Sequence, residues 1–305
     1  MKPSDCSVID LSKRINQVFF LVILAIIWGS SFILMKKGLI SYTAFEITLY
    51  RILVVYIVFI PFCIKKFISL SKKDFFIISL TGIVGSAIPY FLFIKAQTFI
   101  DSSLNGILNS ITPLFTILFG TLLFNQKFTL KTVIGVFTGL VGAIGLIIAA
   151  NGGDLSLNAL IYSLLPLAGS ACYALNLNII KIYLSQISAV LITGVSFFII
   201  GPISGLLLVF RTAFFNQIIN NETNQINFMY ITLLGVIGTG FAVWLFNLLI
   251  KETSSVFASS VTYLIPIVAI IWGIIDGEGF SFIEGIFCFV IFAGVYLIRQ
   301  SPYKT

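Results

Sequence analysis

The sequence has no histidine and few charged residues. Its 305 residues include 18 Lys and Arg and 11 Asp and Glu, so that 10% of the chain is charged. Without histidine, Ser-His-Asp and Cys-His nucleophilic sites and His-ligated metal sites are excluded. A soluble protein of this length also needs more polar surface than so few charges provide. Large soluble folds are therefore excluded, and we do not expect an enzyme.

Cysteine is scarce as well, and its spacing carries no chemistry. The four cysteines (Cys6, Cys63, Cys172 and Cys288) form no CxxC pair, and three of them lie in apolar runs. In such runs a thiol acts as a small hydrophobic group. The nucleotide-binding pattern GxxxxGK[ST] is absent too. We therefore expect no metal, no cofactor and no direct use of ATP.

Apolar residues are what the chain has in abundance. They make up 59% of the sequence, and the mean hydropathy is +1.11. Since a bilayer core about 30 Å thick needs about 20 apolar residues per helix, the continuous apolar runs predict an all-α integral membrane protein with ten transmembrane helices. The expected spans are residues 18–35, 43–64, 75–94, 103–124, 132–150, 157–180, 187–210, 228–250, 254–275 and 282–298.

Most Lys and Arg residues fall in the connections on the side of the membrane that holds the N-terminus. The positive-inside rule then places both termini in the cytoplasm. This topology accounts for the net charge of +7 without nucleic acid, so we expect the lipid bilayer as a partner and no nucleic acid. The longest connection, residues 211–227, is polar and is expected outside.

An internal repeat relates the two halves of the chain. Residues 80–113 align without a gap with residues 233–266, matching Gly82 with Gly235, Gly85 with Gly238 and Pro113 with Pro266. This shift moves the third and fourth spans onto the eighth and ninth, and a shift by five helices reverses the membrane direction. We therefore expect two inverted five-helix repeats, residues 18–150 and 157–298. Such repeats place a binding site near the midplane between the halves and suit alternating access.

Several motifs in this frame carry a family resemblance. They are the run Ala25–Phe32 followed by Lys36-Lys37, the second-span Arg51, Pro113 before the turn at residues 125–129, the Gly-rich fifth span, and the second copy from Pro266 to Gly279. In this order the chain resembles the EamA family of the drug/metabolite transporter superfamily over nearly its whole length. One turn departs from the family pattern: it reads Asn125-Gln126-Lys127 where Gly-Glu-Arg is usual, while the second copy keeps Gly277-Glu278.

The resemblance implies a ten-helix carrier with a central cavity between its halves. Members of this family move small organic metabolites, often amino acids outward. We expect the protein in the cell inner membrane. The expected partner is therefore a small-molecule substrate, with efflux as the direction.

Polar and aromatic side chains at mid-depth are the candidates for substrate binding. Amides and hydroxyls can recognise polar groups while rings pack on an apolar body. The alternative is hydrogen bonding between helices or, for Trp28, contact with lipid. The predicted substrate-binding residues are Trp28, Tyr90, Asn105, Asn109, Tyr173, Asn176, Trp244, Asn247 and Tyr263.

Charged residues and prolines within spans add two further hypotheses. Arg51 is a charge anchor for an anionic group, or else it bonds to carbonyls of a neighbouring helix. Glu46, near the outer end of the same span, is the second predicted charge anchor. Pro113 and Pro266 occupy equivalent places in the two copies and are predicted as hinges or gates, with plain helix kinks as the alternative.

The function that follows is secondary transport by alternating access around a midplane cavity. The alternative is a membrane channel or facilitative pore for small solutes. A membrane-embedded enzyme would need paired carboxylates at mid-depth, and the sequence has no such pair. Small-residue faces at Gly135/Gly139 and Gly201/Gly205 predict close helix contacts, either within one chain or in a homodimer.

Overall fold

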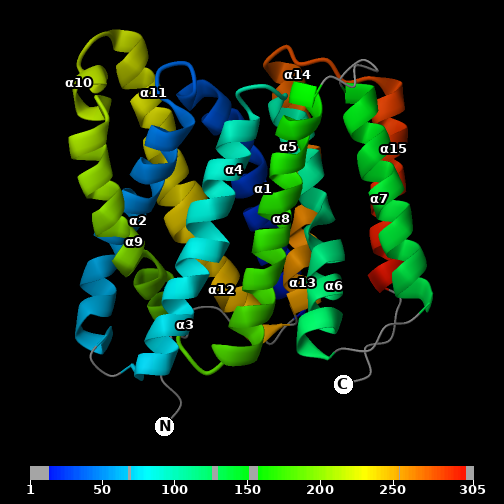
Figure 1. Cartoon of the computed structure of the whole chain (residues 1–305), viewed down its shortest axis with the longest axis horizontal. Helices are drawn as coiled ribbons and strands as arrows, with labels where there is room; N and C mark the ends of the chain where they lie inside the picture. Colours follow the sequence, from blue (N-terminus) through cyan, green and yellow to red (C-terminus); the bar gives the residue numbers. More distant parts are fainter. Residues whose placement is uncertain (1–13, 68–69, 126–129, 151–156, 254, 300–305) are drawn as a thin grey trace.

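The computed structural model is a bundle of long helices packed side by side (Figure 1). It describes residues 14–67, 70–125, 130–150, 157–253 and 255–299, and within these residues it contains no strand. In Figure 1, α1 begins and α15 ends at the lower end of the bundle. We use "lower end" and "upper end" in this sense throughout.

Within the described residues, six long helices are unbroken and four spans are broken. The unbroken helices are α1 (Arg14–Gly38), α2 (Ala44–Phe67), α7 (Leu130–Ala150), α8 (Leu157–Tyr183), α9 (Ala189–Arg211) and α15 (Phe282–Arg299). The broken spans are α3 (Lys72–Gly82), η1 (Ile83–Ala87) and α4 (Ile88–Ala96); α5 (Ser102–Leu108), η2 (Asn109–Ile111) and α6 (Thr112–Phe124); α11 (Glu222–Leu233), η3 (Leu234–Phe241) and α12 (Ala242–Glu252); and α13 (Ser255–Ser259), η4 (Ser260–Tyr263) and α14 (Ile265–Ile275). A short α10 (Phe214–Ile218) lies between α9 and α11.

The apolar composition of these helices makes the protein a multi-pass membrane protein. Eight helical segments of the described residues are long and apolar enough to cross a bilayer. The apolar stretches described for α7 and α15, Phe137–Ala150 and Phe282–Gly294, are shorter. The expected number of ten spans therefore stays a prediction, as does the cytoplasmic placement of both termini.

The two halves break their helices in matching ways. The third and eighth expected spans are interrupted by π-turns, η1 and η3, and the fourth and ninth by 3-10 turns, η2 and η4. Pro113 and Pro266 each lie in the first turn of the helix that follows, where the missing N–H costs no intrahelical bond. The prolines thus begin a new helix segment after the 3-10 turn.

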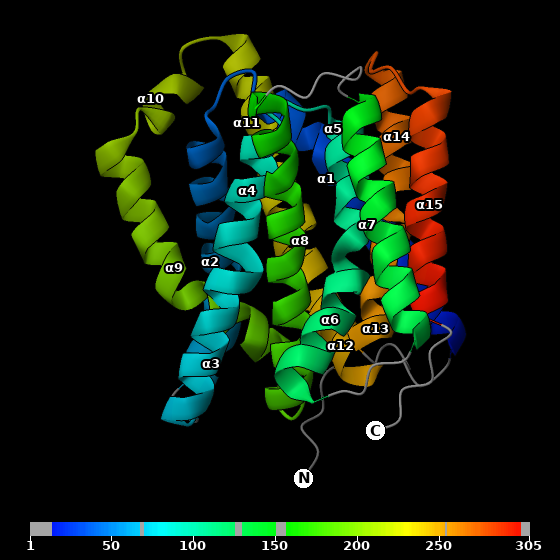
Figure 2. The ribbon, with the colours of Figure 1, turned by 45° about the vertical axis from the view of Figure 1, so that its right-hand side comes forward.

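The matched spans run in opposite directions. In Figures 1 and 2 the chain climbs from α3 to α4, whereas it descends from α11 to α12. This antiparallel arrangement is what an inverted repeat requires.

The expected start of the eighth span is wrong by six residues. The sequence predicts residues 222–227 in a polar connection, but α11 already begins at Glu222. The reason is local: Asn221 is the N-cap, and its Oδ1 accepts a hydrogen bond of 2.8 Å from the Asn224 backbone N–H. The cap extends the helix beyond the apolar stretch.

Glycine lets two pairs of helices approach closely. Helices α7 and α15 pack along one edge of the bundle (Figure 2), where a Cβ on Gly294 would lie 2.5 Å from the Gly139 nitrogen. On α9, a Cβ on Gly201 would lie 2.3 Å from Cβ of Tyr56 on α2. Both small-residue faces are used within one chain, so they give no support to a homodimer.

Replacing Gly294 with Ala should destabilise the protein because the added methyl group would force α7 and α15 apart. We expect a loss of about 1–3 kcal/mol, typical of overpacking, measured as a lower melting temperature in detergent. Gly285→Ala on the same helix is the matched control, since the nearest atom to its Cβ lies 3.8 Å away. It should leave stability unchanged or raise it slightly. Equal melting temperatures for Gly294→Ala and the wild type would contradict the packing described.

Candidate functional site: a central cavity between the two halves

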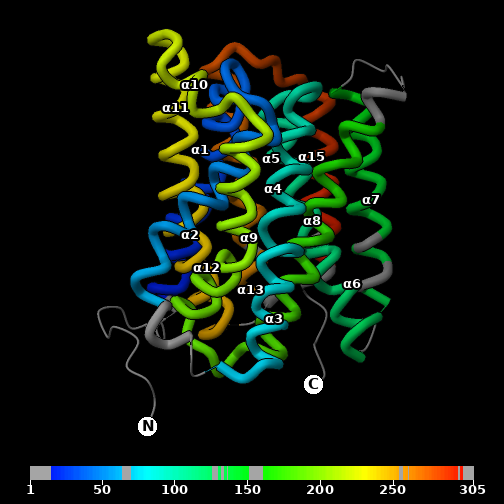
Figure 3. The backbone as a smooth tube through the Cα atoms, turned by 60° about the vertical axis from the view of Figure 1, so that its left-hand side comes forward, coloured from blue at the N-terminus to red at the C-terminus, as the bar shows by residue number. Residues whose placement is uncertain are grey.

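A cavity lies where helices of the two halves meet. First-repeat helices α1 and α2 lie against the second-repeat segments α11, η3 and α12 (Figure 3). The volume of this cavity is about 100 Å³.

Seven of the residues singled out from the sequence line this cavity. The seven residues come from both halves of the chain: Trp28, Arg51, Tyr90 and Asn109 from the first half, and Tyr173, Asn176 and Asn247 from the second half. Whether they bind substrate remains a prediction.

Three other candidate substrate-binding residues do not line it. Asn105 is fully buried and donates from Nδ2 to the Phe93 carbonyl at 2.8 Å, which ties α5 to α4. Trp244 packs on Phe241, with ring centroids 5.7 Å apart. Tyr263 packs against a separate apolar cluster that includes Ile107 and Leu108. Pro113 and Pro266 are also outside the lining.

Glu46 lies outside the lining too, and its carboxylate caps a helix. Its Oε2 accepts hydrogen bonds from the backbone N–H of Thr43 at 2.9 Å and from the Thr43 hydroxyl at 2.8 Å. The Glu46 backbone N–H in turn donates to that hydroxyl. This reciprocal pair is a capping box at the start of α2.

The sequence reasoning missed several lining residues. Ser31, Phe32 and Met35 lie on α1 one and two turns after Trp28, and this helical spacing could have identified them. Glycine and aliphatic side chains make up part of the rest, and the others are small hydroxyl residues and phenylalanines, which are so common in this chain that their type gives no signal. The hydroxyl residues and phenylalanines are Thr81, Ser86, Phe93, Thr112, Ser196, Phe246 and Thr262, and the glycine and aliphatic residues are Gly85, Leu177, Ile180, Ile192 and Val243.

Aromatic rings in contact form much of the wall. Phe93 and Tyr173 are stacked, with centroids 5.6 Å apart and planes at 19°. Trp28 meets Phe246 edge to face at 4.8 Å, and its Nε1 donates to the Gly238 carbonyl at 3.1 Å. Because each contact joins helices of opposite halves, the rings couple the halves at the cavity.

Arg51 is a buried cation in this wall. Only 5% of its surface is exposed. Its Nε donates to the hydroxyl of Thr239 at 3.0 Å, and its guanidinium carbon lies 4.1 Å from the ring centre of Tyr90. In the described part of the chain no carboxylate lies within ion-pair distance of it; the ion pairs found there join Lys36 and Lys37 to Asp276 and Glu278.

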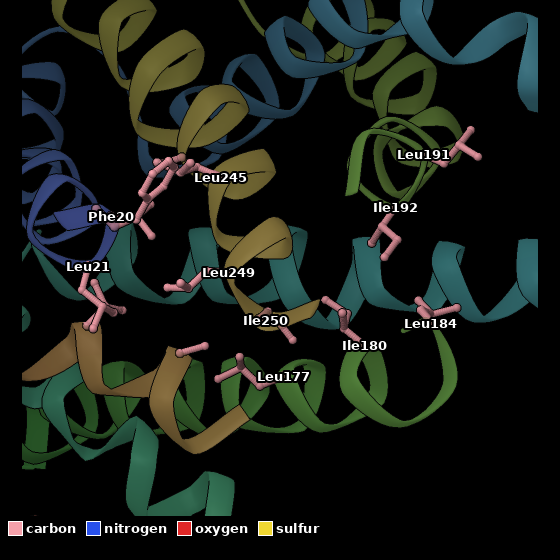
Figure 4. Close-up of a cluster of buried hydrophobic side chains, with 14 of the residues drawn as sticks. Phe20, Leu21, Leu177, Ile180, Leu184, Leu191, Ile192, Leu245, Leu249 and Ile250 are labelled. Atoms are coloured by element: carbon pink, nitrogen blue, oxygen red, sulfur yellow. The ribbon is translucent and has the colours of Figure 1, made fainter. Parts of the chain in front are cut away.

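An apolar cluster forms the floor of the cavity. Leu177, Ile180 and Ile192 belong both to the lining and to this cluster, which we call the lower seal. Figure 4 shows side chains of this cluster on α1, α8, α9 and α12. The labelled members are Phe20, Leu21, Leu177, Ile180, Leu184, Leu191, Ile192, Leu245, Leu249 and Ile250. This apolar packing lies between the cavity and the lower end.

At the upper end the two halves are joined by charges, a group that we call the upper latch. Lys36, in the last turn of α1, pairs with Asp276 at 2.7 Å and with Glu278 at 2.8 Å, and Lys37 pairs with Asp276. Both acids follow α14, where Gly277 adopts φ +86°, a turn conformation that suits glycine. The latch thus connects the first-half α1 to the second-half turn after α14.

Glu278 also caps a helix of the other half. It accepts hydrogen bonds from the Ser102 N–H and hydroxyl at 3.0 and 2.6 Å and from the Ser103 N–H at 3.0 Å, at the start of α5. Burial alone would raise the pKa of Glu278, but the bonds from Lys36, Ser102 and Ser103 outweigh it and lower the pKa from 4.5 to about 2. Hydrogen bonds from Lys36 and Lys37 likewise lower the pKa of Asp276.

The sign of this shift decides when the latch responds to pH. A depressed carboxylate pKa contributes stability above its ordinary value of 4.5, and this contribution is lost as the pH falls toward about 2. Through the physiological range Glu278 stays ionised. The latch therefore needs something other than a neutral-pH proton to open it.

Most of the chain is similar to one known protein family. The model of the EamA-like transporter family matches twice, over residues 16–148 and 160–300. A solved crystal structure, described only as that of a protein, has a TM-score of 0.65 at 14% identity and covers 93% of this chain and 96% of its own. At this identity it shows the fold alone. No curated protein matches the chain.

The two family matches fall on the two halves that form the cavity, and together they cover most of the sequence. Members of this family, which is part of the drug/metabolite transporter superfamily, are transporters of small solutes. The chain belongs to the EamA-like transporter family.

Proposed function

We propose that this protein is a secondary transporter that moves a small organic metabolite, an amino acid or related compound, outward across the cell inner membrane by alternating access. The observation that carries this proposal is the cavity between two inverted halves, with the lower seal on one side and the upper latch on the other. A carrier needs a closure on each side of its site, and these two have different chemistry.

The distribution of lysine and arginine supports an assignment of the two ends. Basic residues at the lower end include Lys72, Lys73, Lys131, Lys181 and Lys251. Of the described residues, fewer basic ones lie at the upper end, namely Lys36, Lys37, Lys95 and Arg211. The positive-inside rule then makes the lower end cytoplasmic and the upper end external.

The chemistry of each closure suggests how it opens. Opening outward separates Lys36 from Asp276 and Glu278, charged groups that external water can hydrate. Opening inward exposes the apolar side chains of the lower seal to water, and this exposure is unfavourable. Contacts with substrate bound between the halves offset the free energy that either opening costs.

Substrate counterflow in liposomes tests the carrier mechanism. The purified chain is first screened by thermal shift in detergent against amino acids, 2-oxo acids, nucleosides, nucleotide sugars and polyamines, because a ligand at 100 times its Kd stabilises by about 2.7 kcal/mol. The compound that stabilises most is then loaded into proteoliposomes, and uptake of its labelled form is followed. We expect saturable uptake with a counterflow overshoot. Uptake that rises linearly with concentration and shows no overshoot would contradict the carrier and favour the channel.

Replacing Glu278 with Gln tests the latch. The change keeps the shape but removes bonds to a charged group, each worth about 1.5–3 kcal/mol, so outward opening should become roughly tenfold more frequent or more. The readout is the rate at which an impermeant thiol reagent added outside labels Ser31→Cys in the cavity, with the four native cysteines replaced.

Glu222→Gln is the matched control, because Glu222 is an exposed glutamate at the start of α11, at the same end of the bundle. It should leave the labelling rate at that of the parent. If Glu278→Gln labels no faster than this control, the latch does not close the outer side.

A further inference from the structure

Among the described residues, Arg51 is the buried basic residue, and its guanidinium has more donors than the partners described for it. It has five N–H donors in a planar fork. The partners described for it are neutral: the Thr239 hydroxyl at 3.0 Å, the Met35 sulfur at 3.6 Å and the Tyr90 ring at 4.1 Å. A buried cation without an anion is costly, so this arrangement leaves a place for an anionic group.

The two π-turns of the bundle place these groups together. Thr239 lies in η3, where its hydroxyl donates back to the Leu234 carbonyl at 3.0 Å and so keeps its oxygen in place as an acceptor for Arg51. Tyr90 follows η1 in the other half. π-turns cost helix regularity and recur at functional sites. Here both of them position groups that hold one arginine.

The rest of the wall has few charges and many rings. Among the described residues that line the cavity, none is acidic, and Arg51 is the single one with a fixed charge. Beside it stand the rings of Trp28, Tyr90, Phe93 and Tyr173. The site therefore matches one negative charge next to an apolar or aromatic body. A second anionic group, or an ammonium group, would find no opposite charge there.

We propose that Arg51 binds the carboxylate of a monoanionic organic acid whose apolar or aromatic body packs on the rings of the cavity. This inference rests on the proposed carrier function and sharpens its substrate class. Among compounds related to amino acids, it favours acids without an ammonium group over zwitterions. A planar guanidinium can form two parallel hydrogen bonds with a carboxylate, which gives orientation as well as charge pairing.

A matched ligand series tests this directly. The three probes are 3-phenylpropanoate, L-phenylalanine and 2-phenylethylamine, which share a ring and differ in carrying a carboxylate, both groups or an amine. Titration calorimetry on the purified full chain should show binding of 3-phenylpropanoate, about tenfold or more weaker binding of phenylalanine, and none of the amine. Phenylalanine binding as tight as that of 3-phenylpropanoate, or no binding of 3-phenylpropanoate, would overturn the proposal.

Variants of Arg51 tie the effect to this residue. Arg51→Gln should weaken binding of 3-phenylpropanoate by at least about tenfold, and Arg51→Lys should retain part of the affinity. The control is Arg211→Gln, since Arg211 is exposed at the upper end of α9, and this variant should bind as the wild type does. Gel filtration checks that each variant is folded. The ligand series measured on the wild type tests the proposal even if a variant does not fold. Wild-type affinity in folded Arg51→Gln overturns the anchor.

Transport separates this inference from the function on which it rests. Counterflow of phenylalanine that survives Arg51→Gln would support a carrier and overturn the carboxylate anchor. Arg51-dependent binding of 3-phenylpropanoate without counterflow of that compound would support the anchor and count against its use in transport.

Discussion

Hydrocarbon offers no hydrogen-bond partner, so every polar group inside this bundle must be satisfied by the protein or by what the protein binds. The architecture follows this constraint closely. Each of the helix breaks η1, η2, η3 and η4 contains buried residues, and groups freed there bond to side chains such as Thr112, Thr239 and Thr262. Arg51 is the group that the chain itself satisfies least well. The cavity beside it is where an external partner can complete the bonding.

The duplication explains how such a site arises from helices. Each half alone would leave its broken spans facing lipid, whereas the inverted pair turns them toward one another. Contacts at the cavity accordingly join distant parts of the sequence: Arg51 meets Thr239, Trp28 meets Gly238, and Phe93 stacks on Tyr173. Moving one half relative to the other must change all of them together. That coupling is what a rocking carrier needs, and a rigid pore does not.

The spans could be predicted from sequence because hydropathy reports burial in lipid directly; α1, α2 and α9 begin and end within four residues of expectation. The contacts that pair one helix with another could not be predicted from the sequence. Nothing local marks Thr239 as the partner of Arg51, since the two are far apart in sequence and meet only through the repeat interface. Asn105 and Asn109 share a helical face, yet the break at η2 separates their environments, so one ties helices and the other lines the cavity. Glu46 carried a readable signal, because Thr43-x-x-Glu46 is a capping box.

The central claim is that the two ends of the cavity open in turn, and distances between spin labels test it most directly. One pair, Ile40→Cys with Phe282→Cys, spans the upper end, and another, Ile15→Cys with Tyr183→Cys, spans the lower end; all four side chains are exposed. Pulsed electron paramagnetic resonance on the protein in nanodiscs, with and without a bound substrate, gives both distance distributions. The account predicts reciprocal changes, so that populations with a wider upper distance keep a short lower one. Simultaneous widening of both ends, or distributions that substrate leaves unchanged, would contradict it.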